Sequence, residues 1–106
     1  MEFALLIHGA ESAWAEMAGD ERQDYFAAHR AFGAGLRESG VRVVYGCRLA
    51  RPESVADAKP RDDGEPELGG MWILDVPSED EAVAWAERLP LKPGDVVELR
   101  LCEHGG

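Results

Sequence analysis

The stretch DERQDYFAAHRAFGAGLRESGVRVVYGCRLA, residues 20–50, places a helix directly before a β-strand. Asp20 is a favourable N-cap with Gln23 at the capping-box position, and Gly40 fits the left-handed position that ends many helices. Ring-bearing and apolar residues recur at helical spacing, which predicts one stripe facing the core: Tyr25, His29, Phe32 and Leu36. From Val41 onward the pattern alternates with period two, as in a strand.

The elements on either side of this helix and strand complete an ordered pattern. Three further strands are predicted at residues 2–8, 68–76 and 95–103, a short helical turn at 10–19, a loop at 50–67 and a second main helix at 79–89. The order β-α-β-β-α-β is that of the ferredoxin-like fold. We therefore predict an α+β domain with a four-stranded antiparallel sheet and both helices on one face. The two most apolar strands, 2–8 and 68–76, are expected at its centre.

Alternation within the edge strands predicts which side chains face the helices. The helix-facing set comprises Val41, Val43, Tyr45, Val97, Leu99 and Leu101. The opposite face then carries Arg42, Arg48, Glu98 and Arg100 beside apolar central strands. Because such a mixed face is rarely left open to water, we expect a homodimer that encloses a polar-lined cavity between two sheets. Cys47 and Cys102 fall on opposite sheet edges and are not expected to pair.

Composition restricts the classes of partner. The 106 residues predict one domain, 1–106, with a net charge of −10 and a pI of about 4.6. This acidity argues against nucleic acid and against an anionic membrane surface, since both require a basic patch. No apolar run approaches the roughly 20 residues of a membrane-spanning helix, and the N-terminus lacks the basic region of a signal peptide. Two cysteines outside any CxxC pattern then favour a reducing, cytoplasmic setting.

Four segments together resemble the YCII-related family, in particular its DGPF branch. They are FALLIHGAESAW (3–14), DERQDYFAAHRAFGAGLRESG (20–40), ELGGMWILDVPSEDEAVAWAERLP (67–90) and PGDVVELR (93–100). The resemblance implies a dimeric α+β barrel built on the ferredoxin-like plan. The segment DDGEPELGG (62–70) lacks the Pro-Phe pair of the branch's Asp-Gly-Pro-Phe loop, and His8 stands where the family usually has a tyrosine. Both changes would alter a pocket, so a specialised substrate is compatible with the resemblance.

The resemblance implies several kinds of function. Some relatives are lyases that act on chlorinated aromatic compounds, and dimeric α+β barrels include isomerases, monooxygenases and cyclases of small aromatic or polyketide-like molecules. Members of the DGPF branch are often associated with extracytoplasmic-function sigma factors, which implies a regulatory alternative. Of the family's site residues, only His29 carries over, because YGCRLA (45–50) offers no carboxylate as its acid partner.

Two histidines are candidates for proton transfer. Because the ordinary pKa of histidine lies near neutrality, His29 is the leading candidate for a general acid or base; its alternative is a histidine at the core edge bonded to a backbone carbonyl. His8 ends the first strand and Glu98 begins the last, so the two could meet across antiparallel strands. There Glu98 would orient His8 for acid–base chemistry, or the two would form only a surface pair at a barrel rim.

Candidates for binding a substrate lie on the predicted cavity face. Arg48 and Arg100 could hold a carboxylate or phenolate, or could instead form salt bridges with carboxylates of the same chain or of a second copy. Tyr45 and Trp72 are expected in the core or the pocket wall. No metal site is expected, because the histidines lack ligand spacing. No nucleotide-binding or nucleophile motif predicts a cofactor.

The sequence therefore leaves three classes of function open. The first is a small cofactor-free enzyme, a lyase, isomerase or cyclase, that moves a proton on a small aromatic or carbonyl-bearing molecule. In such an enzyme His29 would be the general acid or base, and His8 and an arginine would position the charged groups of the substrate. The second is a non-catalytic ligand-binding or regulatory module, and the third is a structural dimerisation domain. A cavity that His29 and an arginine both reach would favour the enzyme.

Overall fold

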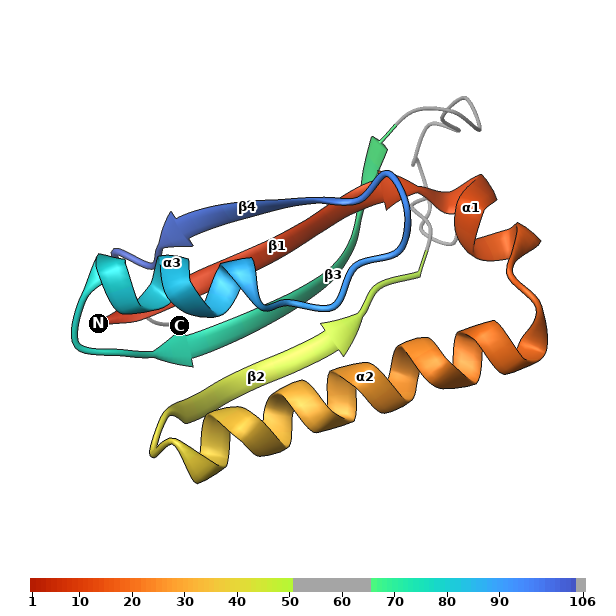
Figure 1. Ribbon diagram of the computed structural model, residues 1–106. Coiled ribbons are helices and arrows are strands. Elements are labelled where there is room, and N and C mark those ends of the chain that lie inside the picture. Colours follow the sequence, from red (N-terminus) through yellow and green to blue (C-terminus); the bar gives the residue numbers. More distant parts are fainter. Residues whose placement is uncertain (51–65, 105–106) are drawn as a thin grey trace.

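A computed structural model describes residues 1–50 and 66–104, which form four strands and three helices (Figure 1). They are β1 (Glu2–Ala10), α1 (Glu11–Glu16), α2 (Gly19–Glu38), β2 (Arg42–Arg48), β3 (Pro66–Asp75), α3 (Glu79–Glu87) and β4 (Val96–Leu101). The strands pair antiparallel in the order β2-β3-β1-β4. This order confirms the predicted α+β, ferredoxin-like class, with the two most apolar strands at the centre. Most of the loop expected at 50–67 lies outside the described residues.

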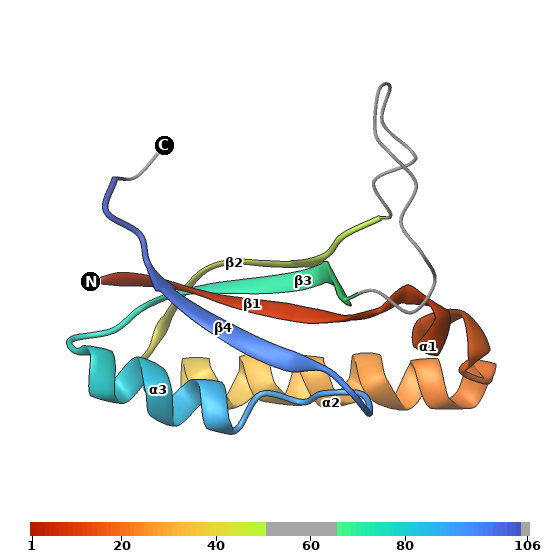
Figure 2. The same ribbon diagram turned by 90° about the horizontal axis from the view of Figure 1, so that it is seen from above.

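Helices α2 and α3 lie on the same side of the sheet, and no described helix covers the other side (Figure 2). The sequence of β1 explains this one-sided arrangement. Phe3, Leu5 and Ile7 are buried while the residues between them are only half-buried. Since successive side chains of a strand point to opposite faces, Phe3, Leu5 and Ile7 all meet the helices, while Leu6 points to the opposite face.

The core fills the space between the sheet and the two long helices. Leu5, Leu36, Leu74 and Val76 are its largest fully buried side chains, and burial of each contributes about 1.5–3 kcal/mol. From the predicted α2 stripe, Leu36 and Phe32 are buried as expected. The earlier stripe residues Tyr25 and His29 lie nearer the helix start and are only half-buried.

The helix ends follow local capping chemistry, with one difference from prediction. Helix α2 begins after Ala18, whose backbone N–H donates to Oε1 of Glu21 at 3.1 Å. The predicted N-cap at Asp20 is therefore wrong, because Glu21 reaches back to a cap one half-turn earlier. Gly40, with a φ of 80°, ends α2 as predicted. The Ser78 hydroxyl accepts a hydrogen bond from the Glu81 backbone N–H and so caps α3.

A bulge in β2 changes the face on which the second half of the strand points. Val43 and Tyr45 pair with consecutive residues of β3, which leaves Val44 without a partner. One extra residue reverses the alternation of all that follow. The predicted faces of Tyr45 and Arg48 are therefore wrong: Tyr45 lies on the helix-free face and is 57% exposed, whereas Arg48 lies on the helix side. The other charged residues, Arg42, Glu98 and Arg100, keep the face predicted for them.

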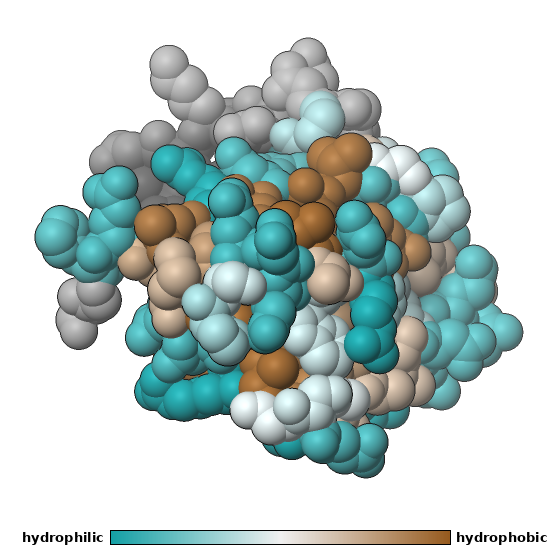
Figure 3. Space-filling model, turned by 60° about the vertical axis from the view of Figure 1, so that its left-hand side comes forward, coloured by the Kyte–Doolittle hydropathy of each residue, from teal (hydrophilic) through white to brown (hydrophobic). Residues whose placement is uncertain are grey.

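The surface is mixed in character. On the face that Figure 3 shows, hydrophobic residues lie between hydrophilic ones and do not form one continuous area. The cysteines, in β2 and just after β4, are free and belong to opposite edges of the sheet, as predicted. Within residues 1–50 and 66–104, no helix combines the length and the apolar character needed to cross a bilayer.

The homodimer stays a prediction, and one exposed residue of the helix-free face offers a test. Tyr45 lies on that face and Val83 is an exposed residue of α3 on the opposite layer. We expect light scattering coupled to size exclusion to give a dimer for the wild type and for Val83→Glu, and a monomer for Tyr45→Glu, because a buried unpaired carboxylate costs several kcal/mol at an interface. A wild-type monomer at all concentrations would contradict the expectation.

Candidate functional site

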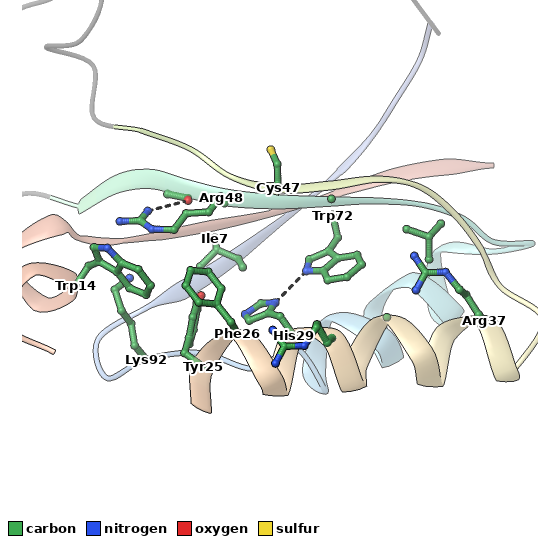
Figure 4. Close-up of a pocket in the computed structure, with 16 residues that line it drawn as sticks. Ile7, Trp14, Tyr25, Phe26, His29, Arg37, Cys47, Arg48, Trp72 and Lys92 are labelled. Carbon is green, nitrogen blue, oxygen red and sulfur yellow. Dashed lines mark hydrogen bonds between the residues drawn. The ribbon is translucent and has the colours of Figure 1, made fainter. Parts of the chain in front are cut away.

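A cavity of about 550 Å³ lies between α2 and the sheet and opens to solvent. Aromatic rings and cations dominate its lining: Trp14, Tyr25, Phe26 and Trp72, and Arg30, Arg37, Arg48 and Lys92. No aspartate or glutamate lines it among the described residues. Cys47 is at its edge, but its sulfur points away (Figure 4). A volume of this size suits a molecule with one or two rings.

Trp72 lies in a slot between a glycine of α2 and a glycine of β2. A Cβ built on Gly33 would be 3.0 Å from Cη2 of the indole, and a Cβ built on Gly46 would be 3.0 Å from its Cε3. Any larger residue at either position would press on the ring, so the two glycines fix the plane of the indole. This is the close approach between helix and sheet that glycine allows.

His29 accepts a hydrogen bond from this fixed indole. Nε1 of Trp72 donates to Nδ1 of His29 at 3.1 Å (Figure 4). The indole nitrogen is a donor only, so Nδ1 carries no proton and the neutral ring carries its proton on Nε2. Nε2 is the one buried side-chain nitrogen or oxygen without a hydrogen-bond partner in the described part of the chain. The Pro90 carbonyl acts on the ring but does not have hydrogen-bond geometry to Nε2.

The environment of His29 favours the neutral imidazole. Burial lowers the pKa of His29 below its ordinary value, and this effect exceeds the opposing influences of the Pro90 carbonyl and the Asp95 carboxylate. The hydrogen bond from Trp72 acts in the same direction as burial, because a protonated ring would turn Nδ1–H against the indole N–H. The geometry therefore makes His29 a hydrogen-bond donor at Nε2 rather than a base at Nδ1.

Tyr25 connects His29 to an aromatic wall. Its ring centroid lies 4.5 Å from that of His29, and it meets Trp14 edge-on at 5.7 Å. Burial and the negative charge of Asp95 raise the pKa of Tyr25, against the opposing charge of Arg48. The phenol is consequently protonated at neutral pH and can act as a donor.

Arg48 is held by the protein itself. Its Nη2 lies 2.9 and 2.8 Å from the two carboxylate oxygens of Glu11, its Nη1 donates to the carbonyls of Leu49 and Gly69, and its Cζ lies 4.1 Å from the centre of the Trp14 ring. Of the two roles considered from the sequence, the salt bridge is the one observed, with Glu11 as the unexpected partner. The guanidinium forms part of the pocket wall, and its charge is neutralised there.

A second ion pair, between Lys92 and Asp95, borders the cavity that His29 lines. Nζ of Lys92 donates to Oδ1 of Asp95 at 2.8 Å, and the Asp95 side chain is completely buried. A Cβ on Gly9 would overlap the Asp95 carboxylate, so the end of β1 requires glycine here. The turn before β4 thus supplies a buried carboxylate whose field reaches both His29 and Tyr25.

The other predicted site residues lie on the helix-free face. Nε2 of His8 and Oε1 of Glu98 are 3.1 Å apart, so these two do meet across strands. Arg100 and Tyr45 point to the same face. The sheet separates this group from His29, and the two histidines cannot act on one molecule within a single chain.

Sequence reasoning missed several residues of the cavity. Trp14 and Glu11 lie in a short helix that has no strong periodicity, and Lys92 and Asp95 lie between α3 and β4 and belong to no motif. Arg30 carried no signal beyond helix propensity. The spacing of Tyr25 from His29 was the one available pointer, because residues four apart share a helix face.

These features define a class: a ferredoxin-like α+β domain whose long helix and sheet enclose a ligand-sized, aromatic and cationic cavity. The chain belongs to the YCII-related family, whose domain model matches residues 1–102. No curated protein matches the chain. Within the described ranges, no group of three histidine, cysteine or acidic side chains is arranged to hold a metal ion.

Alanine substitutions at two glycines of α2 test whether Gly33 is needed for the packing of Trp72. Gly33→Ala should force the indole to shift at a cost of about 1–3 kcal/mol, which offsets the roughly 1 kcal/mol gained from helix propensity. Gly35→Ala meets nothing within 4 Å and should only gain. Chemical unfolding should therefore show Gly35→Ala to be more stable than wild type and Gly33→Ala to be less stable than Gly35→Ala. Equal stabilisation of both variants would contradict the slot.

The lowered pKa of His29 should make the free energy of unfolding depend on pH. As pH falls below the ordinary value of 6.5, the unfolded chain takes up a proton at this position before the folded chain does. The free energy of unfolding then falls until the pH passes the folded pKa. His29→Gln keeps an acceptor for Trp72 but does not titrate. The difference in unfolding free energy, wild type minus His29→Gln, should decrease as pH falls below 6.5, and an increase would contradict the assignment.

Proposed function

We propose that the protein is a small cofactor-free enzyme of the lyase, isomerase or cyclase type, acting in the cavity under α2 on a small aromatic or carbonyl-bearing molecule. The observation that carries this proposal is that His29, whose Nε2 is buried and without a hydrogen-bond partner, lines an aromatic cavity. Leaving a buried donor unpaired costs about 1–3 kcal/mol, and a ligand oxygen at Nε2 would remove that cost. Membership of the DGPF branch stays a prediction.

The role proposed for His29 is to polarise a carbonyl. A neutral imidazole that donates from Nε2 stabilises the negative charge that develops on a carbonyl oxygen as a neighbouring C–H bond breaks. The Trp72 indole is a positioning group that holds this tautomer. Because no carboxylate of the described residues lines the cavity, the carbon-bound proton would leave to water at the open side.

Other residues would shape the site rather than react. Tyr25 is proposed as a second donor to the same oxygen, since its raised pKa keeps the phenol protonated. The Arg48–Glu11 pair supports the Trp14 wall. For the helix-free face, a role of His8, Glu98, Arg100 and Tyr45 in a chamber shared by two copies remains a separate proposal.

One observation favours the alternative of a ligand-binding or regulatory module. Nδ1 of His29 accepts the hydrogen bond from Trp72 and Nε2 is buried, so neither nitrogen is exposed to solvent as a reactive group. Such a module would bind an aromatic ligand in the same cavity without converting it.

Phenylpyruvate provides a test that distinguishes these two functions, because its keto and enol forms interconvert by moving one proton and absorb differently. We expect the protein to accelerate the interconversion, and His29→Leu to lose about 10²-fold of the acceleration, as when one oxyanion donor is removed. His104→Gln, in the exposed tail, is the matched histidine control. Binding without acceleration would support the regulatory module.

His8→Gln, measured alongside, tests the helix-free face. A loss confined to His8→Gln would move the reaction to that face and overturn the proposal for His29. Circular dichroism of each variant checks that the fold is retained.

A further inference from the structure

We propose that Arg30 and Arg37 bind the acidic group of the ligand, so that the substrate class is an aromatic carboxylic acid. This inference rests on the proposed function, because it concerns the same cavity. It also assigns anion binding to two residues that the sequence did not single out, in place of Arg48 and Arg100.

The two arginines lie on one side of α2. They are seven residues apart, which is about two turns and about 10 Å along the helix axis. Both line the cavity. The positions between them on the same face are Gly33 and Ala34, which have almost no side chain. Gly33 brings the Arg37 guanidinium against the Trp72 indole, so an acidic group would meet the guanidinium groups at the cavity edge beside that indole.

Neither arginine has a counter-charge within the described residues. The side chains of Arg30 and Arg37 make no hydrogen bond, ion pair or ring contact there, and the positions three and four residues away in sequence carry no carboxylate. Those positions are Phe26, Ala27, Gly33, Ala34, Gly40 and Val41. In a chain with a net charge of −10, two unpaired cations at one cavity are not explained by a shortage of acidic residues.

The other cations of the cavity behave differently. Arg48 is paired with Glu11, and Lys92 with buried Asp95. Their charges are compensated by the protein and do not call for an anion from outside. The uncompensated positive charge of the cavity therefore comes from Arg30 and Arg37 on α2.

The position of Arg37 connects the acidic group to an aromatic one. A Cβ on Gly33 would lie 3.0 Å from the Trp72 indole and 3.2 Å from Nη1 of Arg37, so the guanidinium and the indole border the same small space. Figure 4 shows Trp72 pointing toward α2, with His29 on one side of it and Arg37 on the other. A ring-bearing acid can therefore place its ring against the aromatic wall, a carbonyl near His29 and its carboxylate at the arginines, where charge-assisted hydrogen bonds are strongest.

The test compares two ketones that differ in the carboxylate. Phenylpyruvate carries it and phenylacetone does not. By calorimetry, we expect wild type to bind phenylpyruvate about tenfold or more tightly than phenylacetone, since one charge-assisted contact is worth at least this factor. In the Arg30→Gln/Arg37→Gln double variant the ratio of the two dissociation constants should fall to about one. Arg88→Gln, at the C-cap of α3 and over the Trp85 ring, is the matched control and should keep the wild-type ratio.

The outcomes separate the inference about the arginines from the proposed function. Equal affinity of wild type for both ketones, or an undiminished ratio in the double variant, overturns the inference about the arginines. The proposed function then stands or falls separately, on whether the protein accelerates deuterium exchange at the α-carbons of phenylacetone and whether His29→Leu removes that acceleration. Failure of wild type to bind either ketone overturns both.

Discussion

The hydrogen bond from the Trp72 indole to Nδ1 of His29 is the interaction on which the site depends. It joins the centre of the sheet to the middle of the long helix, and it decides which nitrogen of the imidazole carries the proton. Gly33 and Gly46 lie on either side of the indole, where a Cβ at either position would come within 3.0 Å of the ring. The two glycines thus help to place the Trp72 indole, and the indole in turn decides which nitrogen of His29 carries the proton.

The fold could be predicted because its signals are redundant. The order of elements, the apolar character of β1 and β3, and the capping of α3 by Ser78 all indicate the same sheet. The site could not be predicted to the same extent, because it depends on one inserted residue. Val44 reverses the alternation of β2, which moves Arg48 under the helices and Tyr45 to the open face. Nothing in an alternating pattern marks which residue will be left unpaired.

The site residues that the sequence predicts are those whose type stands out from their neighbours in the chain. His29 is conspicuous as a titratable ring on an apolar stripe, and Trp72 as a large residue in a central strand. The acid near His29, Asp95, comes from a turn that is distant in sequence and is paired with Lys92, so only the folded chain brings it close. Arg30 and Arg37 resemble ordinary surface residues until the absence of nearby carboxylates and the cavity beside them are considered together.

The structure as a whole combines a neutral donor, an aromatic wall and uncompensated cations in one cavity of an acidic protein. The central claim is that His29 is neutral with its proton on Nε2, and nitrogen NMR of the imidazole tests this most directly. At neutral pH we expect an unprotonated Nδ1 and a protonated Nε2, with a correlation from the Trp72 indole proton to Nδ1. A proton on Nδ1, or a doubly protonated ring at that pH, would contradict the account.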